Sequence, residues 1–230
     1  MIHPNTDQST SSFAPFQIAG WVAAGSLVVY QALLLLLIGL RPDLDPSWHT
    51  ISEWAIGPWG FLMSMGFVLS GLGYAGLAVA LWPRLHRASG RIGLALLIVC
   101  AAGATGVGFF TTDPLGSAPV LPTPRGLAHI LFGSAQLVLL PWAALFISFS
   151  LARHGLSGTP RWLLIGTGLI PIVGFLFFAV YTALFVAPLG NAYGPGVNIG
   201  WPPRAAFFGY MVWVVVVGVG VARARRLERS

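Results

Sequence analysis

Six long apolar runs dominate the pattern of hydrophobic and polar positions along the chain. None of the six contains Asp, Glu, Lys or Arg, and they cover residues 18–40, 59–81, 92–110, 127–151, 162–187 and 205–222. A helix needs roughly 20 apolar residues to cross the hydrocarbon layer of a membrane, where it satisfies its own backbone hydrogen bonds. The pattern therefore predicts an all-α protein, a bundle of six transmembrane helices.

The composition makes the lipid bilayer the main partner of this chain. Of its 230 residues, 56% are hydrophobic and only 8% are charged, so the apolar surface is too large for one soluble core. A net charge of +6 is also found in nucleic-acid binders, but here every basic residue is an arginine close to an apolar run. That spacing is typical of membrane flanks, and we expect no nucleic-acid partner.

The arginines divide the connections between the runs into two chemically different sets. Nine of the twelve lie in the second connection, the fourth connection and the segment after the last run, namely Arg84, Arg87, Arg91, Arg153, Arg161, Arg223, Arg225, Arg226 and Arg229. Because basic flanks stay on the cytoplasmic side, we expect a plasma-membrane protein with both termini in the cytoplasm and the first, third and fifth connections outside. The predicted organisation is a polar tail over 1–17, one membrane domain over 18–222 and a basic tail over 223–230.

The first outer connection carries the signals of a short helix of its own. Asp45 followed by Pro46 is typical of a helix start, and Gly57 followed by Pro58 is typical of a helix end. Between them, an apolar stripe at helical spacing consists of Trp48, Ile51 and Ala55. The pattern predicts a short interfacial helix over 45–57. Tryptophans favour headgroup depth, and we expect this position for Trp48, Trp54 and Trp59.

Polar side chains that can carry chemistry gather on the predicted outer side, close to the membrane boundary. They come from separate segments, and the catalytic candidates are His49, Ser52, Glu53, Asp113 and His129. Two more residues are binding candidates, namely Arg125 and Gln136. Polar groups so near hydrocarbon need polar partners or water. Our hypothesis is therefore that they line a common pocket at the outer face.

Three roles for these side chains remain open. A divalent metal is one, with the ligands His49, Glu53, Asp113 and His129. Acid/base catalysis is another, in which Glu53 or Asp113 acts toward water or a lipid carbonyl while Ser52 or a histidine assists. The third is structural, with a carboxylate paired to Arg125 so that the outer connections are pinned. A haem is not expected, since only His129 lies even partly inside a run.

Three segments resemble the family known as domain of unknown function 998. They are the run 49–60 (His-Thr-Ile-Ser-Glu-Trp-Ala-Ile-Gly-Pro-Trp-Gly), the turn 110–113 (Phe-Thr-Thr-Asp) and the helix start 126–129 (Gly-Leu-Ala-His). The resemblance covers most of the chain and implies a six-helix prokaryotic membrane protein without an established activity. The chain is also faintly similar to membrane metal hydrolases of the alkaline-ceramidase type, which combine Ser, Asp and His at one membrane face. Those proteins use an H-x-x-x-H pair in a late helix, whereas the last two runs here contain no histidine.

The first functional hypothesis is a membrane protein whose outer polar pocket binds a lipid headgroup or another small molecule. Its rival is an outer-leaflet lipid hydrolase, metal-dependent or acid/base, that uses the His/Glu/Asp cluster. A third hypothesis is a small-molecule transporter. It would not be coupled to ions, because the runs carry no carboxylate of the kind that couples ions across a membrane. The sequence leaves open whether the protein is an enzyme, and it does not give the oligomeric state.

Overall fold

Six long helices make up most of the computed structural model, which describes residues 14–114, 122–190 and 194–224. No β-strand occurs in these residues. The helices are α1 (Ala14–Leu40), α2 (Gly60–Leu81), α3 (Ala88–Phe109), α4 (Pro124–His154), α5 (Arg161–Tyr181) and α6 (Trp201–Arg223). All six are long and apolar enough to cross a membrane. The chain is a multi-pass membrane protein, and the predicted six-helix bundle is confirmed.

The helices differ by a few residues from the apolar runs that predicted them, and the differences matter most for α1 and α5. Helix α1 begins at Ala14, so the last residues of the predicted polar tail are helical. Residues 1–13 of that tail and residues 225–230 of the predicted basic tail lie outside the described part. Helix α5 ends at Tyr181 and continues as a π turn, η3 (Thr182–Val186), and a 3-10 turn, η4 (Ala187–Leu189).

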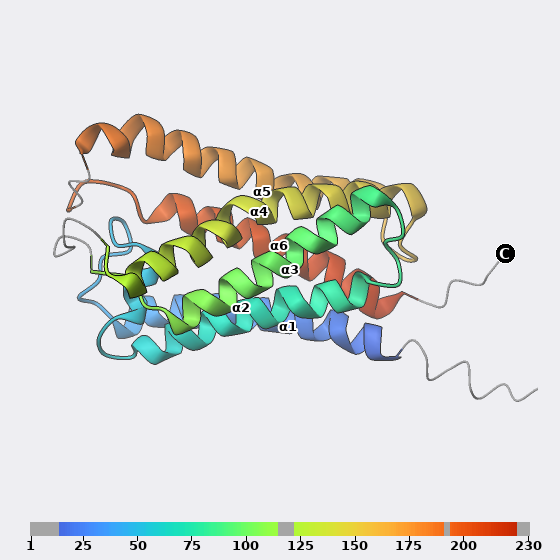
Figure 1. The fold of residues 1–230 in the computed structure, drawn as a ribbon, viewed down its shortest axis with the longest axis horizontal. Coiled ribbons are helices and arrows are strands. Elements are labelled where there is room, and N and C mark those ends of the chain that lie inside the picture. Colours follow the sequence, from blue (N-terminus) through green and yellow to red (C-terminus); the bar gives the residue numbers. More distant parts are fainter. Residues whose placement is uncertain (1–13, 115–121, 191–193, 225–230) are drawn as a thin grey trace, which may run out of the picture.

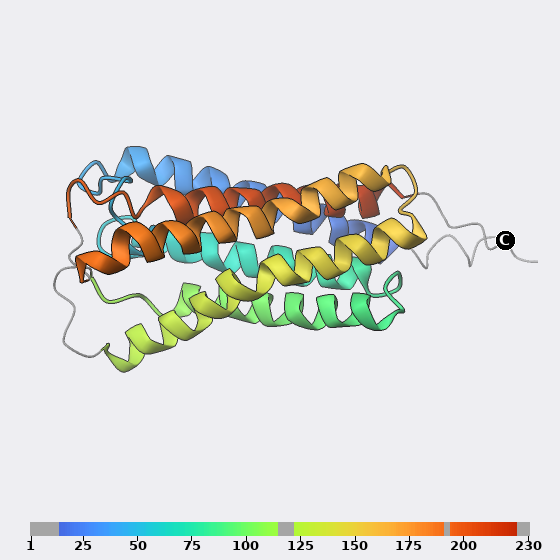
Figure 2. The same ribbon diagram turned by 90° about the horizontal axis from the view of Figure 1, so that it is seen from above.

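The helices form a closed ring in chain order. Each packs against the next one along the chain, and α6 packs against α1. Figures 1 and 2 show them running along the long axis of the molecule, with the connections gathered at the two ends. At one end, which we call the loop-rich end, lie residues 41–59, 110–114 and 194–200. At the other, the arginine-rich end, lie residues 82–87 and 155–160 with the start of α1 and the end of α6.

Small residues let neighbouring helix backbones touch inside this ring. A Cβ on Gly20 of α1 would lie 2.6 Å from the carbonyl oxygen of Gly218 in α6, and one on Gly218 would lie 2.8 Å from that of Gly20. Close approach of this kind is how small residues pack helices in a membrane. The largest fully buried side chains that fill the remaining interior are Trp54, Trp213, Tyr30, Tyr74 and Tyr210.

The first connection forms only part of the short helix predicted over 45–57. Only one 3-10 turn is present, η2 (Ile51–Ala55). The Asp45 carboxylate accepts a hydrogen bond from the backbone N–H of Ser47 (2.8 Å), which closes a local turn before η2. Thr50 and Glu53 then start η2 as a capping box. Two separate local hydrogen-bond patterns therefore replace one continuous helix.

The tryptophans of this connection lie in different surroundings. Trp54 is fully buried, and its Nε1 donates to the carbonyl oxygen of Leu37 in α1 (3.3 Å). Trp59, by contrast, is half-exposed and has a left-handed backbone just before α2. Trp54 thus packs inside the end of the bundle, and the depth of the three tryptophans in the membrane stays a prediction.

Candidate functional site

Arg41 fixes the far end of the first connection. Its Nη1 donates to the carbonyl oxygens of Ile56 (2.7 Å) and Pro58 (3.0 Å). Its Nε and Nη2 donate side by side to the two carboxylate oxygens of Asp43, at 2.9 and 2.7 Å. Hydrogen bonding to Arg41 lowers the pKa of the exposed Asp43 carboxyl, and the same hydrogen bond raises the pKa of the buried guanidinium.

Glu53 and His49 each have a local partner in this connection. The Glu53 carboxylate accepts the backbone N–H of Thr50 (2.8 Å), as a capping box requires. The Nδ1 of His49 lies 3.1 Å from the carbonyl oxygen of Asp45, and its ring lies 3.6 Å from that of Trp48. Both side chains are buried. Their hydrogen bonds are separate, and both belong to the local fold of the connection.

Asp113 holds the start of α4. Its carboxylate accepts hydrogen bonds from the backbone N–H (3.0 Å) and the hydroxyl (2.7 Å) of Thr123. The Thr123 oxygen in turn accepts the N–H of Gly126 in the first turn of the helix (3.0 Å). Arg125 donates to the carbonyl oxygen of Phe109 (3.5 Å), and within the described residues it pairs with neither Asp113 nor Glu53.

His129 and Ser52 are the two predicted candidates that the structure joins directly. The Nε2 of His129 lies 2.8 Å from the Ser52 hydroxyl, and its Nδ1 lies 2.6 Å from the carbonyl oxygen of Phe110. A carbonyl oxygen only accepts hydrogen bonds, so Nδ1 carries a proton and donates it. In the neutral imidazole Nε2 is therefore the acceptor, and the Ser52 hydroxyl donates to it.

Gln136 belongs to the interior of the bundle. It is buried, and its Nε2 donates to the hydroxyl of Tyr74 in α2 (3.2 Å). This contact joins α4 to α2 at a position away from the first connection. The structure thus gives Gln136 a partner of its own among the helices.

Arg204, near the start of α6, is a site residue that the sequence analysis missed. Its Nη1 donates to the carbonyl oxygens of Pro46 (3.1 Å), His49 (3.0 Å) and Gly200 (2.7 Å). Its guanidinium carbon lies 4.4 Å from the centre of the Trp54 ring, a cation–π contact. The side chain is only 5% exposed, yet its Nε and Nη2 have no hydrogen-bond partner among the described residues.

One sequence signal marks the buried position of Arg204. The last apolar run begins at residue 205, so we left Arg204 in the outer connection before it, but Pro202 just inside a helix start places that start at Trp201. Arg204 then lies about one turn inside the helix, where its side chain contacts the first connection. Tyr30 of α1 is close enough to interact with it electrostatically, and the fully buried Tyr30 hydroxyl also has no partner in the described parts of the chain.

The positions of the candidates do not assemble a metal site. In residues 14–114, 122–190 and 194–224 no group of three or more His, Cys, Asp or Glu side chains is arranged to hold a metal ion. The divalent metal stays a prediction. The chemistry that the geometry does display is a hydroxyl on an imidazole and a buried guanidinium with free donors.

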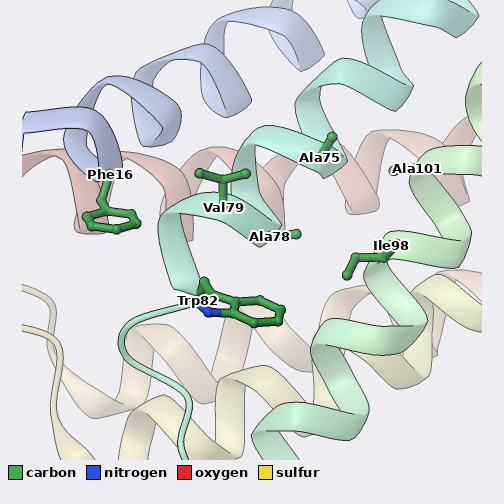
Figure 3. Close-up of a pocket in the computed structure, with 7 residues that line it drawn as sticks. All are labelled: Phe16, Ala75, Ala78, Val79, Trp82, Ile98 and Ala101. Carbon is green, nitrogen blue, oxygen red and sulfur yellow. The ribbon is translucent and has the colours of Figure 1, made fainter.

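An apolar cavity of about 390 Å³ lies toward the opposite end of the molecule. It opens between α1, α2 and α3, and Figure 3 shows its lining side chains: Phe16, Ala75, Ala78, Val79, Trp82, Ile98 and Ala101. Apart from the indole nitrogen of Trp82 these side chains are apolar. The polar chemistry of the protein is therefore found at the loop-rich end and not in this cavity.

Comparison with known proteins places the chain in a family. The family model described as protein of unknown function (DUF998) matches residues 17–220. No curated protein and no solved structure matches the chain. The match extends from α1 to α6 and confirms the resemblance that residues 49–60, 110–113 and 126–129 indicate. The chain belongs to the DUF998 family of proteins of unknown function.

Proposed function

We propose that this membrane protein binds a lipid headgroup, or another small molecule with an anionic group, at its loop-rich end. In this proposal the loop-rich end faces outward from the plasma membrane and both termini lie in the cytoplasm, as the distribution of arginines predicts. The observation that carries the proposal is the free donor edge of the buried Arg204.

Two arginines of the loop-rich end use the same side of the guanidinium in the same way. In both Arg41 and Arg204, Nη1 donates to backbone carbonyl oxygens. In Arg41, the edge formed by Nε and Nη2 holds both oxygens of Asp43. In Arg204 that edge has no partner. Its two parallel N–H groups match the oxygens of a carboxylate or a phosphate, the acceptors that arginine binds in bidentate fashion.

The surroundings of Arg204 also favour an anionic ligand. Taking a charge out of water costs several kcal/mol unless partners compensate it. The ion pair between Arg41 and Asp43 is the only one in the described residues, so no carboxylate is in direct contact with Arg204 there, although Glu53 acts on it electrostatically. The Trp54 and Trp201 rings lie 4.4 and 5.8 Å from its guanidinium carbon. An oxyanion on the free edge would supply a counter-charge in direct hydrogen-bond contact.

Thermal unfolding of the purified protein in neutral detergent tests this proposal. Dioctanoyl phosphatidylglycerol should raise the Tm with increasing concentration, whereas dioctanoylglycerol, which lacks the phosphate, should not. Arg204→Gln and Arg204→Lys should both lose this rise, because glutamine lacks the charge and lysine lacks the bidentate edge. Arg91→Gln at the arginine-rich end is the matched control and should keep it.

Inorganic phosphate separates a headgroup site from a site for a free anion. If the phospholipid and not inorganic phosphate raises the Tm, the ligand is a lipid headgroup. If both raise it in wild type and neither does in Arg204→Lys, the ligand is a small soluble anion. A Tm that responds equally to the lipids with and without phosphate would contradict the proposal.

The proposed orientation has its own test. A reporter that is active only in the cytoplasm, fused after Ser230, should be active in cells, because the arginine-rich end is assigned to the inside. A fusion active only outside the cell would reverse the orientation and place the Arg204 site in the cytoplasm.

A further inference from the structure

The geometry points to Ser52 as a nucleophile with His129 as its general base, and we propose that the pair hydrolyses a carboxylic ester of the bound ligand. This inference rests on the proposed binding function, since Arg204 would hold the anionic group of the same molecule. The substrate class is an ester lipid that carries a phosphate or carboxylate. The proposed hydrolysis does not require a metal ion.

Two contacts give the pair the arrangement that serine nucleophiles use. The Ser52 hydroxyl lies 2.8 Å from Nε2 of His129, within reach for proton transfer. The other ring nitrogen lies 2.6 Å from the carbonyl oxygen of Phe110, which fixes both the orientation and the tautomer of the ring. Nucleophile, base and orienting group are therefore all present, with a backbone carbonyl in the third role.

The fold holds this base rigidly and leaves the serine accessible. His129 belongs to α4 and is buried, with its ring centre 6.5 Å from that of Phe67 in α2. Ser52 lies on the short turn η2 and is half-buried. The carboxylate of Asp113 acts electrostatically on His129 and would stabilise the imidazolium that forms when the base accepts a proton. The pair thus joins a fixed base to an accessible hydroxyl.

Arg204 and the pair are connected through η2. The guanidinium packs on Trp54, two positions after Ser52 in the same turn. The Tyr30 ring, which interacts electrostatically with Arg204, lies 6.2 Å from Phe67, the residue that packs on His129. In this proposal a ligand whose anionic group lies on Arg204 would extend along η2 toward Ser52 at the same end of the bundle.

The reaction needs water as its only co-reactant. The Ser52 oxygen attacks the ester carbonyl carbon and forms a new C–O bond, while the hydroxyl proton passes to Nε2 of His129. The tetrahedral intermediate then expels the alcohol, which takes that proton from Nε2. Water attacks the acyl group on Ser52, His129 accepts its proton and returns it to the serine oxygen, and the carboxylic acid leaves.

A fluorophosphonate probe tests the nucleophile directly, because it reacts with an activated serine and needs no natural substrate. The Ser52 oxygen forms a bond to phosphorus and fluoride leaves, so the intact mass of the full-length protein should rise by one probe group. Peptide mapping should place the label on Ser52. Wild-type protein with a cooperative thermal unfolding transition that remains unlabelled at Ser52 would overturn the inference.

Three variants separate a nucleophile from a hydroxyl that only pins the connection to α4. Ser52→Ala should not be labelled, and His129→Gln should be labelled at least about 100-fold more slowly, because general-base assistance is lost. Ser47→Ala removes a serine of the same connection without an imidazole partner and should be labelled at the wild-type rate. Equal labelling rates in wild type and His129→Gln would assign the pair to structure.

The two proposals fail in different ways. An unlabelled Ser52 together with a Tm rise from dioctanoyl phosphatidylglycerol would overturn the nucleophile and leave the binding function intact. A labelled Ser52 without any response to that lipid would keep the nucleophile and overturn the proposed ligand.

Discussion

The two ends of the bundle differ in how deeply their arginines are buried. At the loop-rich end Arg41 and Arg204 are 6% and 5% exposed and donate to carbonyl oxygens of the connections. At the arginine-rich end the exposed Arg91 and Arg223 lie over tryptophan rings, 4.7 and 5.7 Å from their centres. The buried arginines therefore organise backbone, whereas the exposed ones are placed to meet water and headgroups.

This difference follows from the lengths of the connections. The stretches over 82–87 and 155–160 are short, and little of their backbone needs partners from elsewhere in the chain. The first connection runs over 41–59 without a long helix, and irregular backbone near hydrocarbon must find hydrogen bonds. One guanidinium group supplies several hydrogen bonds at once. An end built in this way brings polar groups into the bundle, and Ser52, His129 and the free edge of Arg204 are found there.

The largest expected effect on stability is the difference between replacing a tryptophan at the loop-rich end and replacing one at the arginine-rich end. Trp54→Ala should lower the free energy of unfolding by about 3–5 kcal/mol, because it leaves a cavity under η2 and removes the ring on which Arg204 packs. Trp82→Ala at the arginine-rich end removes an exposed ring and should change the free energy of unfolding by about 0.5 kcal/mol or less. Reversible unfolding in mixed micelles, followed by circular dichroism, measures both values. Similar losses in the two variants would show that the ends do not differ in packing.

Hydrophobicity alone predicted the helices because a membrane imposes one simple requirement on each of them. A span needs length and apolar side chains, and the runs meet this requirement whatever their neighbours are. The loop-rich end has no such rule. The starts Asp45-Pro46 and Thr50-x-x-Glu53 compete within one short segment, and tertiary burial of Trp54 decides between a long surface helix and one inserted turn.

The candidate site was predictable in its residue types and not in its partners. Ser52 and His129 are both among the predicted candidates, but they are 77 residues apart, and only the packing of η2 against α4 brings them together. Glu53 caps η2 with Thr50, three positions away, which a short-range pattern can indicate, whereas Asp113 bonds to Thr123 from ten positions away. Arg204 was missed because counting charges at membrane flanks does not distinguish a buried arginine from an exposed one.

The N-termini of α4 and α5 give a second way to test the difference between the ends. Thr123 caps α4 with its side chain, whereas the N-cap residue of α5 is Pro160, which provides no side-chain cap. Thr123→Ala should therefore lower the free energy of unfolding by about 1–2 kcal/mol. Ser157→Ala, in the exposed connection before α5, should lower it by less than about 0.5 kcal/mol. Equal values would mean that the cap at the loop-rich end adds no stability.

A smaller effect is expected from the coupling of Ser52 to His129. The single variants Ser52→Ala and His129→Ala should be non-additive by about 1 kcal/mol, because each removes the same hydrogen bond. Glu53→Gln with His129→Ala should be additive within about 0.5 kcal/mol, since Glu53 bonds to Thr50 and shares no partner with the imidazole. The two double-mutant cycles are measured by urea unfolding of the same preparations. Stronger coupling in the Glu53 cycle would support the common pocket, which stays a prediction from the sequence.

The smallest expected effect is a change of thermal stability at acidic pH, and it too should arise at the loop-rich end. The pKa of Asp43 is lowered, first by its hydrogen bond to Arg41, so the folded state favours the carboxylate. A lowered pKa contributes stability above the unfolded value of about 3.9 and loses it as the pH falls through the folded value. The Tm difference between wild type and Asp43→Asn should therefore be positive at about pH 6 and shrink below about pH 4.

In an Arg41→Gln background the Tm difference should be much smaller at every pH, because the main cause of the pKa shift is gone. A difference that stays constant on acidification would show that the pair of Arg41 and Asp43 does not stabilise the first connection, and that Arg41 acts through its carbonyl contacts alone.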